Sequence, residues 1–422
     1  MLQSAHRRVV ITGMGVVSPN GNNVEAYAHS LAHGVSGLRW LNGESGAAPP
    51  ALQTRIVGRV TDFDPSEVIG PAETRRVPRM VPLAIAASRE ALTRAHLQID
   101  LQDIESQRSI GVALGTGGGG MAFVEDQYRV FFLEGKGSVF SITAGTPGNL
   151  SSELSIALHL RGPSHVLSTG CTSSTDAIGY AAMLIRNGII PMMLAGGADS
   201  PISPGILTTF ERMRVVSTRR WDHPSQASRP FSIDRDGFIL AEGAWMFVLE
   251  EREHALSRGA PVLAELVGYA STCDAYHRVQ IDPEVTEPVR AMELALQNAN
   301  VAKDEIGYIN LHGTSTELND RLETAVVRKC FGHRSSSIPA SSTKSMIGHP
   351  QGACGAAGLA ATVLALRDGI LHPTINLDHP DPACDLDYIP NKARQVRIDT
   401  AVCNCIAFGS KNSVLVIKRH FP

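Results

Sequence analysis

The segment His165-Val-Leu-Ser-Thr-Gly-Cys-Thr-Ser-Ser-Thr-Asp176 decides the fold, because it contains a strand pattern, a turn and the start of a helix. Residues 165–168 have the apolar character of a short buried strand. Gly170 then permits a tight turn, and apolar spacing predicts a helix from about Asp176 to Asn187. The segment therefore predicts a strand, a turn that carries Cys171, and a helix.

The same alternation of strands and helices runs along the rest of the chain. Expected strands cover 8–13 (ending in a turn at Gly13), 109–114, 192–195, 245–249, 262–269, 306–310 and 412–418, and expected helices cover 24–33, 79–96, 289–300, 320–329 and 354–366. Such alternation indicates an α/β protein with layered helices and sheets. Arg258-Gly-Ala-Pro261 ends a helix before a new strand, so we expect two similar halves, 1–258 and 259–422, packed as one body.

Composition excludes several classes of protein. The chain has 422 residues, of which 43% are hydrophobic and 19% charged, as in compact globular proteins. Its formal net charge is −3 without long runs of one sign, so nucleic acid is not an expected partner. The apolar stretch from Ala177 to Ala198 is interrupted by Arg186, Asn187 and Pro191, and the apolar run before Gly13 is too short for a secretory signal. We expect a cytoplasmic protein without a membrane span.

The seven cysteines suggest free thiols in a reducing compartment, because their number is odd and their spacing shows no repeated pairs. Cys403 and Cys405 are separated by one residue, which could indicate a metal ligand pair. No second pair or suitably spaced histidine completes such a site in the sequence. We therefore predict no metal.

Cys171 is the first candidate for chemistry. A glycine before it and a helix after it place its sulfur near a helix N-terminus, where the helix dipole favours a thiolate. The three residues that follow are small and leave room for a ligand. A packed core thiol is the commoner fate of a free cysteine, and the local sequence does not separate the two interpretations.

His312 and His349 are the next candidates. His312 follows an expected strand, and His349 ends the motif Lys344-Ser-Met-Ile-Gly-His349, which is followed by several glycines. A single histidine in a loop is usually a surface or core residue. Two histidines in such settings, together with the cysteine, favour acyl transfer through oxyanion intermediates. Lys344 could be an ordinary surface residue, but we expect it to be buried and paired with Glu323.

The loop Gly115-Thr-Gly-Gly-Gly-Gly120 matches the G-x-G-x-x-G pattern of dinucleotide sites and follows an expected strand. It lies far from the start of the chain, and the residues after it would have to begin a phosphate-binding helix. We favour a close-packed backbone loop over a dinucleotide-dependent oxidoreductase.

Taken together, these motifs resemble the β-ketoacyl synthases, the condensing enzymes of the thiolase-like superfamily. The resemblance covers nearly the whole chain, and its carriers are Gly170-Cys-Thr-Ser-Ser-Thr-Asp176, Pro230-Phe-Ser-Ile-Asp-Arg-Asp-Gly-Phe238, His312-Gly-Thr-Ser-Thr316 and Lys344-Ser-Met-Ile-Gly-His349. It implies a five-layer αβαβα fold of two duplicated halves, with the nucleophile in the first half and the two histidines in the second. Such enzymes are usually dimeric.

The resemblance also implies roles for individual residues. Cys171 is similar to the acyl-accepting nucleophile, and His312 and His349 are similar to the pair that supports malonyl decarboxylation. Lys344 resembles the structural lysine, matched by Glu323. The expected contacts to acyl chain and phosphopantetheine come from Thr314, Thr316, Ile406 and Phe408.

Shorter motifs resemble a narrower group, the ketosynthase-alpha subunits of type II polyketide synthases. They are Ala198-Asp-Ser-Pro-Ile-Ser-Pro204, Thr272-Cys-Asp-Ala-Tyr-His277, Asn319-Asp-Arg-Leu-Glu-Thr324 and Pro380-Asp-Pro-Ala-Cys-Asp-Leu-Asp-Tyr-Ile-Pro390. This implies acyl carrier protein as a partner, which brings its own phosphopantetheine, and no free cofactor. It also implies a heterodimer with a chain-length factor. The alternatives are a homodimeric fatty-acid elongation enzyme and a non-condensing scaffold that only binds acyl carrier protein.

The chain departs from the family pattern at its C-terminal loop, Cys405-Ile-Ala-Phe-Gly-Ser-Lys411. Ile406 stands where fatty-acid enzymes have a gating phenylalanine, and Ala241 replaces a glycine in another loop. These departures leave the expected chemistry intact and bear on acyl selectivity.

Overall fold

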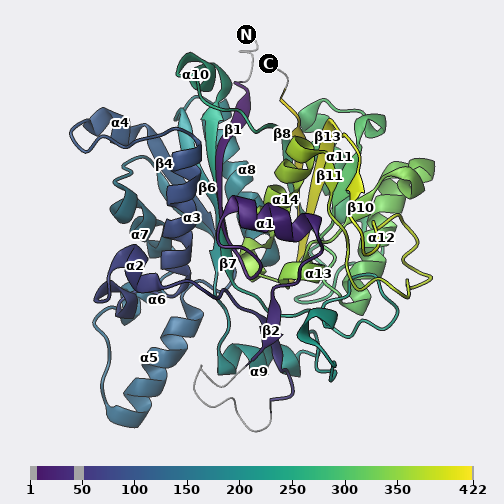
Figure 1. Cartoon of the computed structure of the whole chain (residues 1–422), viewed down its shortest axis with the longest axis horizontal. Helices are drawn as coiled ribbons and strands as arrows, with labels where there is room; N and C mark the ends of the chain where they lie inside the picture. Colours follow the sequence, from purple (N-terminus) through teal and green to yellow (C-terminus); the bar gives the residue numbers. More distant parts are fainter. Residues whose placement is uncertain (1–6, 42–51, 421–422) are drawn as a thin grey trace.

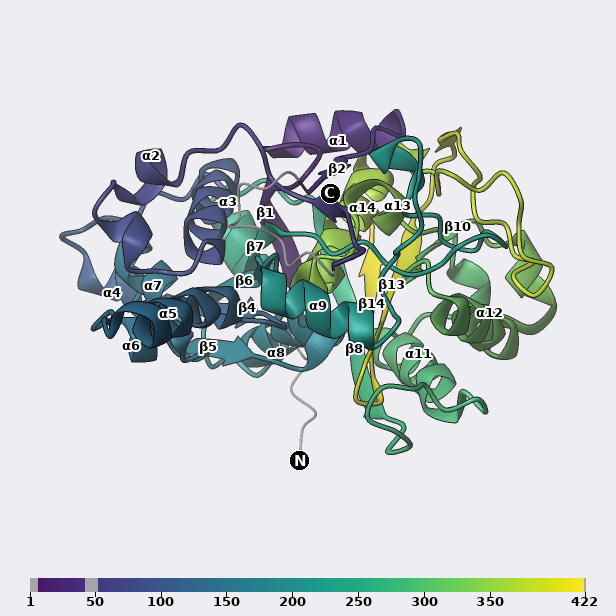
Figure 2. The same cartoon turned by 90° about the horizontal axis from the view of Figure 1, so that it is seen from below.

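The computed structural model describes residues 7–41 and 52–420. Figure 1 shows an α/β body in which most of the first half lies on the left and most of the second half on the right. Figure 2 shows the same division from below, with α9 (Pro204–Arg212) between the two sides. The expected α/β class is confirmed.

The expected strands and helices are all present, with ends shifted by a few residues. The first half contains β1 (Val9–Val17), α1 (Val24–Ala32), β2 (Leu38–Trp40), β3 (Ile56–Gly58), α2 (Pro65–Ile69), α3 (Met80–Arg94), α4 (Ile104–Arg108), β4 (Ile110–Gly115), α5 (Met121–Glu134), α6 (Ser141–Gly145), α7 (Asn149–Leu158), β5 (Ser164–Leu167), α8 (Ser173–Arg186), β6 (Met192–Asp199), α9, β7 (Gly243–Glu251) and α10 (Arg252–Ser257). The second half contains β8 (Ala264–Cys273), α11 (Thr286–Ala299), β9 (Tyr308–Asn310), α12 (Glu317–Phe331), β10 (Ala340–Ser341), α13 (Lys344–Ile347), α14 (Cys354–Asp368), β11 (Ile370–Leu371), β12 (Arg394–Gln395), β13 (Thr400–Ala407) and β14 (Lys411–Lys418).

The two halves have the same sheet topology. The strand order is β1-β7-β6-β4-β5 in the first half and β8-β14-β13-β9-β10 in the second. In each half the first two pairings in this order are antiparallel and the last two are parallel. The halves join where β1 and β8 pair over only two residues, Val10 with Glu265 and Ile11 with Ala264.

The duplication extends to a local irregularity. The register of β1 on β7 shifts just before Gly13, and the register of β8 on β14 shifts just before Gly268. A Cβ atom on Gly13 would lie 2.1 Å from the carbonyl oxygen of Ala91, and one on Gly268 would lie 2.4 Å from that of Ala295. Each glycine therefore lets a helix, α3 or α11, pack directly on the first strand of its half.

Five layers result from this arrangement. Helix α3 covers β1 and β7 on the outside of the first sheet, and α11 covers β8 and β14 on the outside of the second. Helices α8 and α14 pack against each other between the sheets. Residues 354–366 of α14 are all buried, which agrees with a central layer. The expected five-layer arrangement of two duplicated halves is therefore present.

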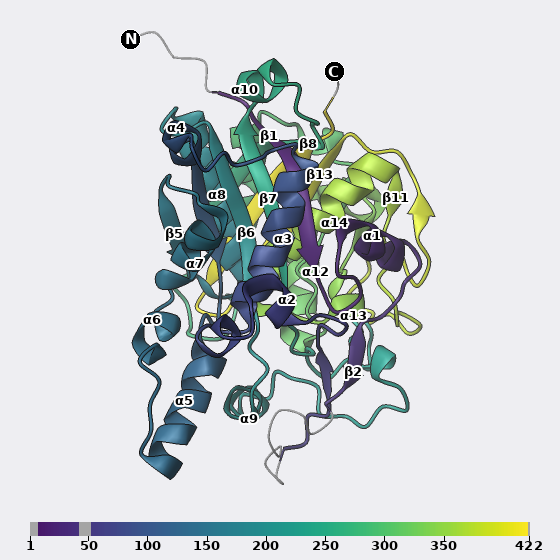
Figure 3. The same cartoon turned by 60° about the vertical axis from the view of Figure 1, so that its left-hand side comes forward.

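Three details differ from the sequence-based expectation. Strand β1 continues past Gly13 to Val17, because Gly13 serves close packing and not a turn. Helix α8 begins at Ser173, which is earlier than expected. Several elements were not predicted, among them helices α5, α7 and α9 and strand β13; α5 extends away from the body at the lower edge of Figure 3. No helix within the described residues has the length and apolar character that a membrane span requires.

Candidate active site

Cys171 lies in a 3-10 turn, Gly170–Thr172, between β5 and the N-terminus of α8. Gly170 has a φ of +73°, a left-handed conformation that glycine adopts without strain, so the chain can turn sharply from the strand into the helix. Cys171 is buried, with 6% of its surface exposed.

His349 is the nearest catalytic candidate to this thiol. Its Nε2 lies 3.2 Å from Sγ of Cys171. The backbone of His349 is fixed by hydrogen bonds with Ile239 and Ala241, and its ring contacts Phe238 edge-on with 5.1 Å between centroids. Its Nδ1 has no hydrogen-bond partner among the described residues, so no neighbour fixes the tautomer of the ring.

His312 follows β9, and its ring stands nearly perpendicular to that of His349 with 5.3 Å between centroids. The buried carboxylate of Glu323, on α12, accepts hydrogen bonds of 2.7 Å from the backbone N–H groups of His312 and Gly313. Asn404 donates a further hydrogen bond of 2.6 Å to Glu323. Glu323 therefore holds the His312 loop from behind.

Lys344 is buried, as expected, but it does not form the predicted ion pair with Glu323. Its Nζ donates a hydrogen bond of 2.6 Å to the backbone carbonyl of His312. Lys344 and Glu323 thus bind the same loop at different backbone groups. Burial opposes the charge of Lys344, but neighbouring thiols and the Glu323 carboxylate outweigh it, and the pKa of Lys344 is raised.

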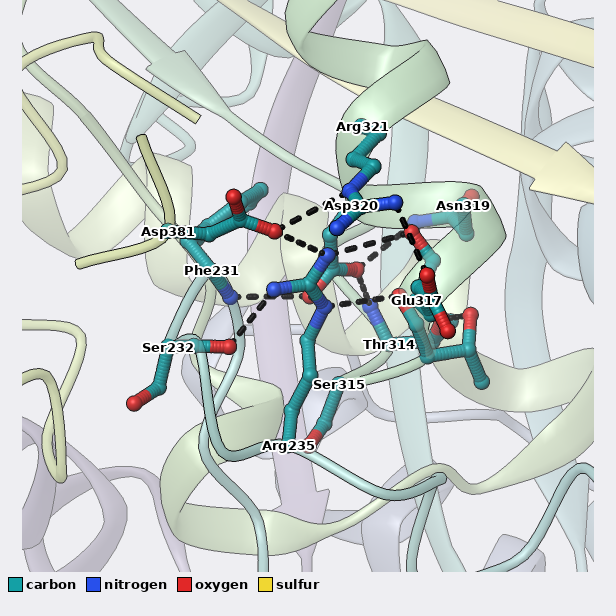
Figure 4. Close-up of polar contacts among 12 residues, drawn as sticks. Phe231, Ser232, Arg235, Thr314, Ser315, Glu317, Asn319, Asp320, Arg321 and Asp381 are labelled. Carbon is teal, nitrogen blue, oxygen red and sulfur yellow. Dashed lines mark hydrogen bonds and ion pairs between the residues drawn. The ribbon is translucent and has the colours of Figure 1, made fainter. Parts of the chain in front are cut away.

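A buried ionic network holds the other side of the His312 loop (Figure 4). Arg235 lies between the carboxylates of Asp320 and Asp381 at 3.5 and 3.0 Å. Asp320 accepts hydrogen bonds from the backbone N–H groups of Thr314 and Phe231. All three charged residues lie in motifs quoted from the sequence, but their pairing was not predicted, because the motifs lie on three separate segments.

One cavity of about 290 Å³ is lined by the predicted site residues other than Lys344 and Glu323. Cys171, His312 and His349 line it together with Thr314, Thr316, Ile406 and Phe408. The hydroxyl oxygens of Thr314 and Thr316 are 2.9 Å apart. Apolar side chains such as Val279, Ile281 and Leu318 complete the wall.

Burial determines the charge state of the reactive groups. It raises the pKa of the Cys171 thiol, and the adjacent Cys354 raises it further. This opposes the thiolate that the helix start predicts. Burial also lowers the pKa of His349 and, together with the Lys344 ammonium, lowers the pKa of His312 to about 3. Burial thus opposes charge on all three groups.

Two further thiols lie behind the nucleophile. From the sequence, Cys405 was considered only as a pair with Cys403, and Cys354 was given no role. The sulfur atoms of Cys354 and Cys405 are 3.6 Å apart, and each lies 3.2 Å from the backbone carbonyl oxygen of Cys171. Cys354 begins α14 and Cys405 is on β13, so only the fold brings them together.

The glycine loop after β4 has a structural explanation. The carboxylate of Asp199 accepts hydrogen bonds from the backbone N–H groups of Gly117 and Gly118, and another from Gly352. These N–H groups are therefore occupied, and a buried carboxylate stands where a phosphate would need positive potential. The loop packs the two halves together, as we favoured.

Comparisons with known proteins agree with this geometry. The family model described as the N-terminal domain of β-ketoacyl synthase matches residues 6–255, and that of the C-terminal domain matches residues 263–378. The chain is 40% identical over 417 residues to 3-oxoacyl-[acyl-carrier-protein] synthase 2 of Coxiella burnetii, covering 98% of this chain and 99% of the relative. It is 39% identical over 428 residues to the tetracenomycin polyketide synthase ketoacyl synthase alpha subunit of Streptomyces glaucescens, covering 99% of each.

A solved structure indicates the same family. A type II polyketide synthase ketosynthase, determined with its acyl-carrier protein and bound to the hexaketide, is 32% identical with a TM-score of 0.89, covering 98% of this chain and 100% of the other. The cavity, its cysteine and its two histidines thus occur in a fold and a sequence shared over nearly the full length. The chain belongs to the β-ketoacyl synthase family, whose members are condensing acyltransferases.

Proposed function

We propose that this protein catalyses the decarboxylative condensation of an acyl group, held on Cys171, with malonyl-acyl carrier protein. The observation that carries the proposal is the contact of 3.2 Å between Sγ of Cys171 and Nε2 of His349, with the ring of His312 facing the same cavity. A nucleophile and two imidazoles in one buried cavity suit acyl transfer and enolate stabilisation.

The first step is transfer of the acyl group. Nε2 of neutral His349 accepts the proton of the Cys171 thiol, and the sulfur attacks the thioester carbonyl of the incoming acyl carrier. The carbon–sulfur bond to the phosphopantetheine arm breaks, and its thiolate takes the proton back from His349. The backbone N–H groups of Cys171 and Phe408 are the donors we assign to the developing oxyanion.

The second step breaks the bond between the malonyl carboxylate and its α carbon, which releases carbon dioxide and leaves an enolate. The Nε2–H group of His312 is a donor for the enolate oxygen. His349 is the second donor once Cys171 is acylated, in the tautomer that has its ring hydrogen on Nε2 and no longer on Nδ1. The enolate carbon then attacks the acyl carbonyl on Cys171, and the cysteine sulfur leaves and takes up one proton. The products are a β-ketoacyl thioester on the carrier, carbon dioxide and the free enzyme.

The charge states and contacts of the buried residues agree with the roles assigned in these two steps. An imidazolium beside Cys171 could not accept its proton, and burial keeps both rings neutral. Lys344 and Glu323 bind only backbone groups of the His312 loop, so we assign them to positioning. Thr314 and Thr316 are the hydroxyls we assign to the phosphopantetheine arm, and Ile406 and Phe408 to the gate over the acyl chain.

We place this activity in type II polyketide biosynthesis, in the cytoplasm and without a free cofactor. The ketosynthase-alpha motifs and the polyketide relatives support this placement. A fatty-acid elongation enzyme is the second candidate, because the relative from Coxiella burnetii is equally similar. We also propose that the two halves divide at residues 258 and 259, between α10 and β8.

The exposed side of the first half suits a partner chain. Strand β5 ends the sheet, and the nearby helix α5 exposes large apolar side chains, with Phe132 79% and Leu133 74% exposed. Exposed apolar surface of this kind marks an interface. One solved relative is described as a ketosynthase/chain length factor, and we propose a chain-length factor as the partner here.

Two experiments test the proposal. Incubation with an acyl thioester of acyl carrier protein, followed by mass spectrometry, should show the acyl group on Cys171. Its absence would favour a scaffold that only binds the carrier.

Co-expression with a candidate chain-length factor tests the pathway. A stable heterodimer that is required for activity supports polyketide synthesis. An active homodimer that elongates fatty acyl chains would instead support the second candidate.

A further inference from the structure

The thiols of Cys354 and Cys405 form a compact group of donor atoms with Nδ1 of His312. The two sulfur atoms are 3.6 Å apart, and Nδ1 lies 3.5 Å from the sulfur of Cys405 and 4.0 Å from that of Cys354. All three side chains are at least 97% buried. None of the steps proposed above uses either thiol.

The backbone carbonyl oxygen of Cys171 is the candidate for a fourth ligand. It lies 3.2 Å from both sulfur atoms. Zinc binds sulfur at about 2.3 Å and imidazole nitrogen at about 2.0 Å, so a tetrahedral site has sulfur atoms roughly 3.8 Å apart and sulfur–nitrogen distances of roughly 3.5 Å. The distance between the sulfur atoms and the distance from Nδ1 to the Cys405 sulfur match this pattern within about 0.2 Å, and the distance from Nδ1 to the Cys354 sulfur is about 0.5 Å longer.

The charge of such a site is balanced. Two thiolates neutralise a divalent cation, and soft sulfur donors with one imidazole favour zinc over hard cations. The thiols must lose two protons, which leave through the adjacent cavity as the cation enters. Near the site, the Lys344 ammonium favours thiolates, and its hydrogen bond to the His312 carbonyl keeps the imidazole in place.

We infer that Cys354, Cys405 and Nδ1 of His312 form a binding site for a soft cation such as Zn²⁺, directly behind the nucleophile. A cation on Nδ1 leaves the hydrogen of the ring on Nε2, the nitrogen on the opposite side of the imidazole. The same binding event therefore fixes His312 as a hydrogen-bond donor.

The test is a zinc titration of the full chain, kept reduced with a phosphine and freed of metal with a chelator. Competition with a chromophoric chelator should show one Zn²⁺ per chain. Cys354→Ala and Cys405→Ala should each weaken binding by more than about a hundredfold, since loss of even an outer partner of a ligand costs ten- to a hundredfold. Co²⁺ should give thiolate-to-metal charge-transfer absorption that both variants lack.

Two variants serve as controls. Cys403 is buried on the same strand as Cys405, but its sulfur faces the carbonyl of Gly355 at 3.8 Å, so Cys403→Ala should bind zinc normally. Cys171→Ala should also bind zinc, because its backbone carbonyl remains. Cys405→Ser retains a small polar side chain, and it replaces Cys405→Ala if that variant unfolds.

Three results would overturn the inference. They are zinc binding no tighter in the parent protein than in Cys354→Ala, loss of zinc in Cys171→Ala with retention in Cys405→Ala, and loss of two free thiols to a disulfide without bound metal. The proposed condensation does not depend on this site. Acylation of Cys171 can therefore succeed where zinc binding fails, and the reverse.

Discussion

The two halves of the molecule share one scaffold but contribute different chemistry. Both have five strands in the same order, with a register shift and a glycine at the same place in the first strand. In the first half the loop after β4 consists of glycines, whereas in the second half the corresponding loop after β9 carries His312. Before the central helix, the first half has Cys171 and the second half has His349.

Each half holds the loop after the fourth strand in its sheet order, β4 or β9, with a buried carboxylate. Asp199 binds backbone N–H groups of Gly117 and Gly118, and Glu323 binds those of His312 and Gly313. The same arrangement, a buried carboxylate that accepts hydrogen bonds from two backbone N–H groups, thus holds a packing loop in one half and a catalytic loop in the other. We conclude that the duplicated fold supplies positions, and that residue identity at strand ends supplies reactivity.

The largest expected effect is the loss of elongation when Cys171, in the first half, is replaced. Decarboxylation, which we assign to the histidines of the second half, can then be measured by itself. Cys171→Ala should abolish elongation, because no other thiol reaches the same place at the start of α8. Cys171→Gln should mimic the acylated state and still decarboxylate malonyl-acyl carrier protein. Mass spectrometry of carrier-bound products measures both, with Cys403→Ala as an active control; elongation by Cys171→Ala would contradict the assignment.

The second effect tests the histidines of the second half. Replacing His312 or His349 by Ala should lower the condensation rate by about 10²–10³, as expected for the loss of an oxyanion-type donor. His349→Ala should also slow acylation of Cys171, because its Nε2 contacts the thiol, while His312→Ala should not. Single-turnover acylation measures this difference, and turnover like that of the parent in either variant would exclude these roles.

The third effect is a loss of stability that tests whether the equivalent glycines of the two halves, Gly13 and Gly268, have the same structural role. Gly13→Ala and Gly268→Ala should each destabilise the protein by about 2 kcal/mol, because the new methyl group would overlap a carbonyl of α3 or α11. Gly137→Ala is the control, since a Cβ there meets nothing within 4 Å. Urea unfolding gives the free energies, and a neutral Gly268→Ala would break the equivalence of the halves.

The fourth effect is a pH dependence of stability that comes from histidines of the second half. Its three buried histidines have lowered pKa values, to about 3 for His312 and about 4 for His372, with burial the main cause. Below the unfolded pKa of about 6.5 the unfolded chain binds protons that the folded chain does not. Stability therefore falls as pH falls, by up to about 1.4 kcal/mol per pH unit for each histidine, until the folded pKa is reached.

His312→Gln should reduce this slope by up to one histidine's share between pH 6 and pH 4. Chemical unfolding at several pH values measures the difference. An unchanged slope in His312→Gln would show that the ring is protonated in the folded protein.

Much of this protein follows from its sequence alone. Hydrophobic periodicity predicted the α/β elements, because the buried face of a strand or helix requires apolar residues at regular spacing along the sequence. The motifs around Cys171, His312 and His349 predicted one shared site, and the structure brings all three into one cavity. Local patterns contain this information because strand ends and helix starts are set by residues close in sequence.

Other features of the site could be seen only in the tertiary structure, because these features depend on contacts between residues far apart in the sequence. Burial raises the pKa of the Cys171 thiol and so opposes the thiolate that the helix start favours, and Lys344 binds a backbone carbonyl where the sequence suggested Glu323. Gly13 appeared to end a strand, and only the packing of α3 explains why the strand continues. The thiols of Cys354 and Cys405 meet only because α14 and β13 are neighbours in the folded chain.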